Sequence, residues 1–400
     1  MKIAIISDIH LGYERFEEDA LAQAREAFGL AARLADAVLI PGDVFDKRYP
    51  KPEVIAQAIN LFRELSKNDW GARIVDFKGH GKIYTDVPIV AIPGTHERIA
   101  EGKDNALRLL SLAGLLADTS EATTVLQKGD EKVAIFGLGG LSEEMVAERL
   151  KKLDARPIGG MLNIFMFHQS IYELLPFSKH FMTYNDIPKG FDLYVCGHIH
   201  NRVETTVHGK KLLIPGSTVI TQLKDKEQEQ KGFLLLDTAD LRHEFMYIKS
   251  RPFIEKSISF SCATPAHIIE KCEKEISDIM AKEEAVPIIR LKLTGTVAEG
   301  FSGTDIQARP LQSKYLGRAY IYIDQTKLVS PDLESKIDGI REGKIGDMPV
   351  KELGTITLMS KMKDLGIDKS IDISGLFNIL SSQTNREKML KEASEFLFKV

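Results

Sequence analysis

Short apolar runs alternate with segments of helical periodicity over the first 100 residues of the chain. The runs at 3–6, 37–40 and 88–92 are rich in Ile, Val, Leu and Ala, which predicts strands that are buried on both faces. Between the first two runs, apolar residues recur at helical spacing over 20–34. A strand, a helix and a second strand in this order predict a βαβ unit, with parallel strands and a right-handed crossover.

The same alternation continues to about residue 200 and then changes. Apolar runs at 133–138, 161–167 and 191–196 predict further buried strands. Beyond them, residues 203–207 and 211–214 flank a His-Gly turn, as the two strands of a hairpin do. The first half of the chain is therefore predicted to be α/β, with an antiparallel end.

The length of 400 residues exceeds one ordinary core, since a domain takes ~150 residues on average. We place one boundary near Ser250, which gives a first domain at 1–250. Residues 251–324 then compose a small α+β unit. Regular patterning fades over 325–372, which predicts a linker arm, and returns over 373–400 as a helical tail.

Composition limits the possible locations and partners. The chain is 44% hydrophobic and 28% charged, and it contains no apolar run of the length that spans a membrane. Its first residues do not resemble a signal peptide, and its three cysteines follow no disulfide or metal spacing, so we expect a cytoplasmic protein. A net charge of −4 argues against a broadly basic coat for nucleic acid, although a local groove or a bound metal ion can still attract phosphate.

Histidines and carboxylates follow almost every predicted strand. Because the carboxyl ends of parallel strands share one edge of a sheet, these side chains are expected to converge. A single histidine after an apolar run is more often an ordinary core residue, but several at successive strand ends favour a metal site. Imidazole and carboxylate without thiolate suit Mn²⁺, Fe²⁺ or Zn²⁺. The residues concerned are Asp8, His10, Asp43, Thr95, His96, His168, His198 and His200.

These residues lie in the motifs SDIH, GDVFD, GTHE, FHQ and GHIH, in that order. The set resembles the calcineurin-like metallophosphoesterases, whose pattern is D-x-H, G-D, G-N-H-[DE], H and G-H-x-H. The longer stretches SDIHLG, GDVFDKRYP and FDLYVCGHIH resemble the DNA double-strand-break repair nucleases called SbcD in bacteria and Mre-eleven in archaea and eukaryotes, the archaeal type in particular. The resemblance is strong over 1–250. It implies a sandwich of mixed sheets flanked by helices, a small capping domain that binds DNA, and a helical tail.

The resemblance also implies a dinuclear centre with two Mn²⁺ ions. His96 would face the phosphate and stabilise or protonate the leaving group, and Asp46 would have a supporting role. Thr95 departs from the family pattern, because it places a short hydroxyl where the family has an Asn amide, so the second metal site is expected to be weaker. The implied ligands are Asp8, His10 and His200 for the first ion, Thr95, His168 and His198 for the second, and Asp43 as the bridge between them.

The implied function is Mn-dependent exonuclease and endonuclease processing of DNA double-strand-break ends, together with an SMC-like ABC-type ATPase. A homodimer and a nucleoid-associated location are expected with it. The apolar stripe of the tail would dock on the coiled-coil base of that ATPase. Two other functions stay open. One is a different metallophosphoesterase, either a small-molecule phosphodiesterase or a phosphatase, and the other is a DNA-tethering scaffold with a weakened second metal site.

Overall fold

The structure, a computed structural model, describes residues 1–78, 84–98, 103–175, 181–223 and 229–330. The chain separates into two compact units. Among the described residues, the first unit consists of 1–256 with 278–290 and 315–322, and the second takes up 257–277, 291–314 and 323–330. All residues of the candidate site belong to the first unit.

The first unit contains two sheets. In the six-stranded sheet, four neighbouring strands, β1, β2, β4 and β5, run parallel. The later strand β12 pairs antiparallel with β1 on the other side. Three helices cover its outer face. The strands, in spatial order, are β13 (His243–Tyr247), β12 (Gly232–Asp237), β1 (Lys2–Ile5), β2 (Ala37–Ile40), β4 (Ile89–Ala91) and β5 (Ala117–Asp118), and the helices are α1 (Glu17–Leu34), α2 (Pro52–Ser66) and α3 (Ala106–Leu112).

The second sheet has seven strands and a parallel centre formed by β7, β8 and β9. The predicted hairpin forms one edge and pairs its second strand parallel to β9. The strands, in spatial order, are β10 (Val203–Val207), β11 (Lys210–Ile214), β9 (Leu193–Cys196), β8 (Leu162–Phe167), β7 (Glu131–Leu138), β6 (Thr123–Lys128) and β3 (Arg73–Lys78), with helix α4 (Glu143–Lys152) and the short 3₁₀ turn η1 (Tyr184–Asp186) beside them.

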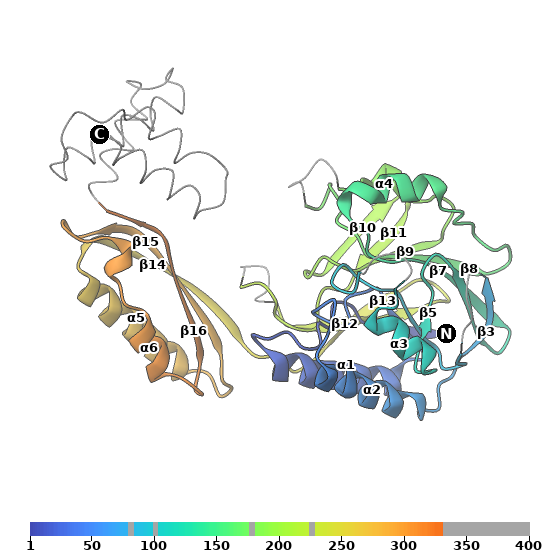
Figure 1. The fold of residues 1–400 in the computed structure, drawn as a ribbon, viewed down its shortest axis with the longest axis horizontal. Coiled ribbons are helices and arrows are strands. Elements are labelled where there is room, and N and C mark those ends of the chain that lie inside the picture. Colours follow the sequence, from blue (N-terminus) through green and yellow to red (C-terminus); the bar gives the residue numbers. More distant parts are fainter. Residues whose placement is uncertain (79–83, 99–102, 176–180, 224–228, 331–400) are drawn as a thin grey trace, which may run out of the picture. The chain divides into compact units, whose positions relative to one another are not determined.

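The two sheets face each other and form the inner layers of a four-layer sandwich. Along β1, Ile3 and Ile5 pack against side chains of the second sheet, whereas Ala4 and Ile6 pack against the helices α1 and α2. This alternation is what a strand buried on both faces requires, and it explains the continuous apolar runs in the sequence. Figure 1 shows α1 and α2 on one side of the sandwich and α4 on the opposite side. The predicted sandwich of mixed sheets flanked by helices is confirmed.

The later part of the chain forms a three-stranded sheet with strand order β14, β15, β16. Its long helix buries Ile268, Cys272 and Ile276, which follow one another at four-residue spacing on one face. The elements are β14 (Phe253–Ala263), α5 (Pro265–Met280), β15 (Ile288–Val297), the 3₁₀ turn η3 (Gly303–Asp305), α6 (Arg309–Lys314) and β16 (Tyr320–Val329).

Several elements differ from the sequence-based prediction. Strand β3 and helix α4 were not predicted, because β3 is an edge strand without a buried face and α4 buries only Val146 among its described side chains. Strand β16 continues to Val329, so residues 325–329 belong to a strand and not to the predicted linker arm. The remainder of that arm and the predicted tail at 373–400 lie outside the described residues.

No helix in the described part of the chain combines the length and the apolar character that a membrane crossing requires.

Candidate metal centre

The candidate site lies where the carboxyl ends of strands from both sheets meet. Asp8 and His10 follow β1, and Asp43 follows β2. His168 follows β8 and His198 follows β9, which are strands of the other sheet. The prediction of a single sheet edge was therefore wrong in this respect. The residues converge because two sheets face each other with their strand ends gathered on the same side.

The backbone at this site is unusual. The φ angles of Asp8, His10, Asp43 and His198 are 51°, 51°, 50° and 75°, which places all four in the left-handed region. Strand β1 ends at Ile5, so Asp8 and His10 do not lie on an extended segment as their two-residue spacing suggested. Strained backbone conformations of this kind persist where the surrounding structure enforces them, and they concentrate at functional sites.

One cluster consists of Asp8, His10 and His200, whose ligand atoms lie within 4.8 Å of one another. The Nε2 atoms of His10 and His200 are 3.2 Å apart, and Asp8 Oδ1 is 3.6 Å from His200 Nε2. Ser7 donates a hydrogen bond to the carboxylate of Asp8, and the hydroxyl of Thr221 contacts His200 Nδ1. Ser7 and Thr221 thus orient the side chains of this cluster.

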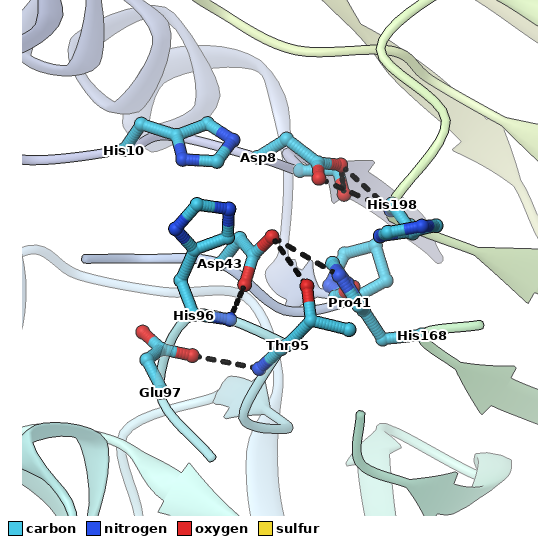
Figure 2. Close-up of polar contacts among 12 residues, drawn as sticks. Asp8, His10, Pro41, Asp43, Thr95, His96, Glu97, His168 and His198 are labelled. Atoms are coloured by element: carbon cyan, nitrogen blue, oxygen red, sulfur yellow. Dashed lines mark hydrogen bonds and ion pairs between the residues drawn. The ribbon is translucent and has the colours of Figure 1, made fainter. Parts of the chain in front are cut away.

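A second cluster consists of Asp43, His168 and His198. Asp43 Oδ2 lies 3.1 Å from His168 Nε2 and accepts a hydrogen bond of 3.5 Å from the Thr95 hydroxyl. Figure 2 shows Thr95, His168 and His198 on one side of Asp43 and the rings of His10 and His96 on the other. Asp43 therefore occupies the centre of the site.

Burial and charge shift the pKa values of this second cluster. Burial alone would raise the pKa of Asp43, but the charge of His168 and of two further imidazoles holds it well below its usual range. Burial would lower the pKa of His168, but the Asp43 carboxylate raises it to about 9. Burial, reinforced by the charge of His168, lowers the pKa of His198 to about 4, so His198 is neutral at pH 7 and its ring can act as a ligand.

His96 and Asp46 form a third group together with His10. Asp46 Oδ1 is 3.3 Å from His10 Nδ1, and the backbone carbonyl oxygen of Asp46 is 2.5 Å from His96 Nδ1. The side chain of His96 is 43% exposed, whereas that of His10 is 1% exposed. The ring of His96 therefore faces solvent at the mouth of the site, and Asp46 holds both rings.

Glu97 is the last residue of the GTHE motif, and the sequence predicted no role for it. It is 1% exposed, and its two carboxylate oxygens accept hydrogen bonds from the backbone N–H groups of Phe45 at 2.9 Å and Gly94 at 2.7 Å. Burial and the charge of Asp43 raise its pKa to about 8. Glu97 ties the loop after β2 to the loop after β4. Only the motif itself signalled this residue, because its partners are distant backbone groups.

Three further contacts fix the side chains of the second cluster, and no sequence pattern predicted them. The carbonyl oxygen of Pro41 is 2.7 Å from His168 Nδ1, and the hydroxyl of Ser170 is 2.8 Å from His198 Nε2. The backbone N–H of His96 donates to Asp43 Oδ1 over 2.9 Å. Such outer contacts set which ring nitrogen carries the hydrogen, and they orient the ligands of metal sites.

Gly197 packs directly beneath these rings. A Cβ atom at this position would lie 2.0 Å from the carbonyl oxygen of Pro41 and 2.6 Å from His168 Nδ1. Any side chain would therefore displace the contact that orients His168. By contrast, a Cβ at Gly159 meets nothing within 4 Å.

We expect Gly197→Ala to lower the free energy of unfolding by about 1–3 kcal/mol, as overpacking in a core does, and to abolish divalent-metal binding. Gly159→Ala, which adds the same methyl group in open space, should leave both properties unchanged. Thermal unfolding and calorimetric metal titration of the two variants measure the effect. Wild-type metal affinity in Gly197→Ala would show that the close approach at this glycine is dispensable for the site.

The described residues fit a pair of divalent cations. A carbonyl oxygen only accepts, so His168 Nδ1 carries the hydrogen that it shares with Pro41, and Nε2 faces a carboxylate oxygen at 3.1 Å, where its raised pKa places a proton that a divalent cation would replace. This Nε2 atom and the buried His10 Nδ1 each face a carboxylate oxygen, that of Asp43 and that of Asp46 at 3.3 Å, and make no other contact in the described part of the chain. Lone pairs held so close together repel each other unless a proton or a cation lies between them. The donor set of imidazole and carboxylate suits Mn²⁺, Fe²⁺ or Zn²⁺.

The calcineurin-like phosphoesterase family model matches residues 1–202. The chain belongs to this family. Calcineurin-like phosphoesterases are dinuclear metal-dependent hydrolases, and the acidic and histidine clusters described above lie within or beside the matched segment.

Curated proteins named for double-strand break repair are similar to the chain. It is 25% identical to "Double-strand break repair protein MRE11" of Oryza sativa subsp. indica, over 80% of this chain and 54% of the relative. It is 25% identical to "DNA double-strand break repair protein Mre11" of Methanocaldococcus jannaschii, over 98% of each. For the protein of the same name from Sulfolobus acidocaldarius the identity is 24%, over 74% of this chain and 76% of the relative. The chain spans about half the length of the plant relative.

Proposed function

We propose that the chain is a metal-dependent DNA nuclease that processes double-strand-break ends, with two Mn²⁺ ions as its cofactors. The observation that carries the proposal is the pair of largely buried clusters, Asp8, His10 and His200 in one and Asp43, His168 and His198 in the other, in which ring nitrogens and carboxylate oxygens converge. The named relatives support DNA as the substrate, above all the archaeal one that aligns over 98% of both chains.

In this proposal Asp8, His10 and His200 hold one ion, and His168, His198 and Thr95 hold the other. Asp43 is shared, in keeping with its central position. When bound, such a pair of ions supplies Lewis-acid stabilisation of the phosphate and a water of lowered pKa. The chain's own contribution is to fix the ligands, through the contacts of Ser7, Pro41, Ser170 and Thr221.

His96 is the proposed group that acts on the leaving oxygen. Because the carbonyl oxygen of Asp46 accepts from Nδ1, the hydrogen of the neutral ring is on Nδ1 and Nε2 is free to gain a proton. A protonated Nε2 at the exposed mouth of the site can donate that proton to the departing sugar oxygen. Asp46 is a positioning residue in this scheme, since it holds the rings of both His96 and His10.

Cleavage of end-labelled linear duplex and hairpin DNA by the full chain, at increasing Mn²⁺, tests the proposal. A chromogenic phosphodiester without nucleosides is the parallel substrate. We expect cleavage of DNA that depends on added metal. Cleavage of the small diester alone would instead support a small-molecule phosphodiesterase. DNA binding without any cleavage would support the tethering scaffold.

The presence of Thr95 predicts that the two ions bind with unequal affinity. Its hydroxyl is a poorer ligand than the Asn amide oxygen of the family pattern, so the ion near His168 and His198 is expected to bind more weakly. Thr95→Asn should tighten that ion and raise the rate of DNA cleavage at limiting Mn²⁺, with little change at saturating Mn²⁺. Calorimetry and rate measurements over a Mn²⁺ titration check this. Unchanged stoichiometry and rates would mean that the hydroxyl already serves fully.

The proposed function also involves binding partners, a capping domain and a C-terminal tail. We propose DNA ends and an SMC-like ABC-type ATPase as partners, with a homodimer as the assembly. The predicted capping domain at 251–324 would contribute to DNA binding, although two of the lysines in this region, Lys271 and Lys314, pair with the glutamates Glu275 and Glu273. The tail proposed to bind the ATPase lies outside the described residues.

A further inference from the structure

Ser217, three residues after the end of β11, joins the two loops that carry Asp8 and His200. Its side chain is buried, and it forms an isolated parallel bridge with Ser7, the residue before Asp8. Its backbone N–H donates to the carbonyl oxygen of His200 over 3.1 Å. Ser7 follows a strand of the six-stranded sheet and His200 a strand of the seven-stranded sheet, so the two halves of the first cluster, Asp8 and His10 on one side and His200 on the other, meet at Ser217.

The backbone around Ser217 packs tightly against that of the histidine. Gly216 has a φ of 80°, and a Cβ atom there would lie 2.8 Å from the carbonyl oxygen of His200 and 3.1 Å from the backbone nitrogen of Arg202. With so little space between the two segments, a shift of Ser217 also shifts the backbone of His200.

Lys231 fixes the side chain of Ser217. The lysine is 5% exposed, lies directly before β12, and donates from Nζ to Ser217 Oγ over 3.1 Å. An ammonium group has no lone pair and only donates, so the Ser217 hydroxyl is the acceptor in this bond. The hydroxyl donates its own hydrogen to the carbonyl oxygen of Val219 at 2.7 Å. Both hydrogen-bonding roles of the hydroxyl are therefore assigned, and the side chain is held in one orientation.

The burial of Lys231 needs a reason beyond packing. Lysine is among the residues that are least often fully buried, because removing its ammonium group from water is costly. An apolar side chain of the same length would fill the same space without that cost. A requirement for a strong, donor-only contact to Ser217 accounts for a lysine at this position.

We propose that Lys231 and Ser217 are positioning residues for the first cluster. Lys231 holds Ser217, and Ser217 sets the separation of the loops that carry Asp8 and His200. The inference rests on the proposed function, because it takes this cluster to be the site of one Mn²⁺ ion. The rings of the second cluster are oriented by Pro41 and Ser170 instead, so the pair should affect one ion and spare the other.

Calorimetric titration of the full chain with Mn²⁺ tests this assignment. Lys231→Met keeps the length of the side chain and removes its donor. We expect one ion to bind about 10- to 100-fold more weakly, as on loss of a contact behind a metal ligand, while the other ion keeps its wild-type affinity. Ser217→Ala should give the same loss. The double variant should lose nothing further, because the lysine acts through the serine.

Two background variants identify the affected ion. His168→Ala removes a proposed ligand of the second ion, and His200→Ala removes one of the first. Lys231→Met should weaken the remaining ion in the His168→Ala background and leave it unchanged in the His200→Ala background. Lys211→Met is the matched control and should bind both ions as the wild type does. Lys211 also donates to a neutral oxygen, the carbonyl of Leu241 at 3.0 Å, but lies near the start of β11, away from the end that leads to the site.

Equal weakening of both ions by Lys231→Met overturns the assignment, and so does wild-type affinity for both ions, even if thermal stability falls. If Lys231→Met does not fold, Ser217→Ala decides by the same criteria, since it removes the same bond by deleting one oxygen atom. Cleavage of DNA separates this inference from the proposed function. Selective loss of the first ion in a protein whose wild type cuts no DNA would support the positioning role and refute the nuclease. DNA cleavage by the wild type with unchanged metal binding in Lys231→Met would do the reverse.

Discussion

Replacing Asp43 with Asn should abolish DNA cleavage, with a loss of at least about 10³-fold in rate, because both proposed ions depend on this one carboxylate. The substitution preserves shape and removes one charge from the centre of a buried site, next to the three imidazoles that hold the pKa of Asp43 down. Asn can still accept the hydrogen bond from the backbone N–H of His96, so the loop is expected to stay folded. The loss should therefore arise from metal binding.

Thermal unfolding with and without Mn²⁺ separates a loss of metal binding from a loss of folding. A ligand that binds only the native state raises the unfolding temperature, so Mn²⁺ should stabilise the wild type and have little effect on Asp43→Asn. Asp192→Asn is the matched control, since Asp192 also accepts a backbone N–H, that of Asn163 at 3.0 Å, but lies at the start of β9, remote from the strand ends that carry the site. Wild-type stabilisation by Mn²⁺ in Asp43→Asn would contradict the bridging role.

The sequence predicted the fold and many of the residues that converge at the candidate site, because both depend on local signals. Strands buried on two faces produce continuous apolar runs, and ligands at strand ends produce short motifs such as GHIH. Gly197 is part of the GHIH motif, but the atoms that leave no room for a Cβ atom there belong to Pro41 and His168, which are distant in sequence.

Contacts between distant segments could not be predicted in this way. Pro41, Ser170 and Thr221 orient histidines that are 127, 28 and 21 residues away in sequence, and nothing in their surroundings distinguishes them from ordinary turn residues. The left-handed backbone at Asp8 and Asp43 was equally hidden, because such conformations are set by the tertiary structure and not by the residue type. The pairing of two sheets around the site has the same origin.

His96 should behave differently from the proposed ligands, because its ring and its backbone have separate tasks. The backbone N–H holds Asp43 Oδ1 at 2.9 Å, and this bond survives any side-chain substitution that keeps the loop. The ring is exposed and contacts the carbonyl oxygen of Asp46. His96→Ala should therefore bind Mn²⁺ as the wild type does, while DNA cleavage falls by about 10²–10⁴-fold, the usual contribution of a general acid.

The leaving group distinguishes protonation from other roles of the ring. A sugar oxygen leaves as a strongly basic alkoxide and needs a proton, whereas p-nitrophenolate leaves unaided, so His96→Ala should cleave bis(p-nitrophenyl) phosphate at a rate close to that of the wild type. His208→Ala is the matched control: its ring also contacts a backbone carbonyl oxygen, that of Ile187 at 2.8 Å, but lies in the hairpin turn after β10. An equal loss on both substrates would assign the ring to phosphate stabilisation. A loss of Mn²⁺ binding as large as in Asp43→Asn would make His96 part of the metal site, because the acid and the ligands would then no longer be separable.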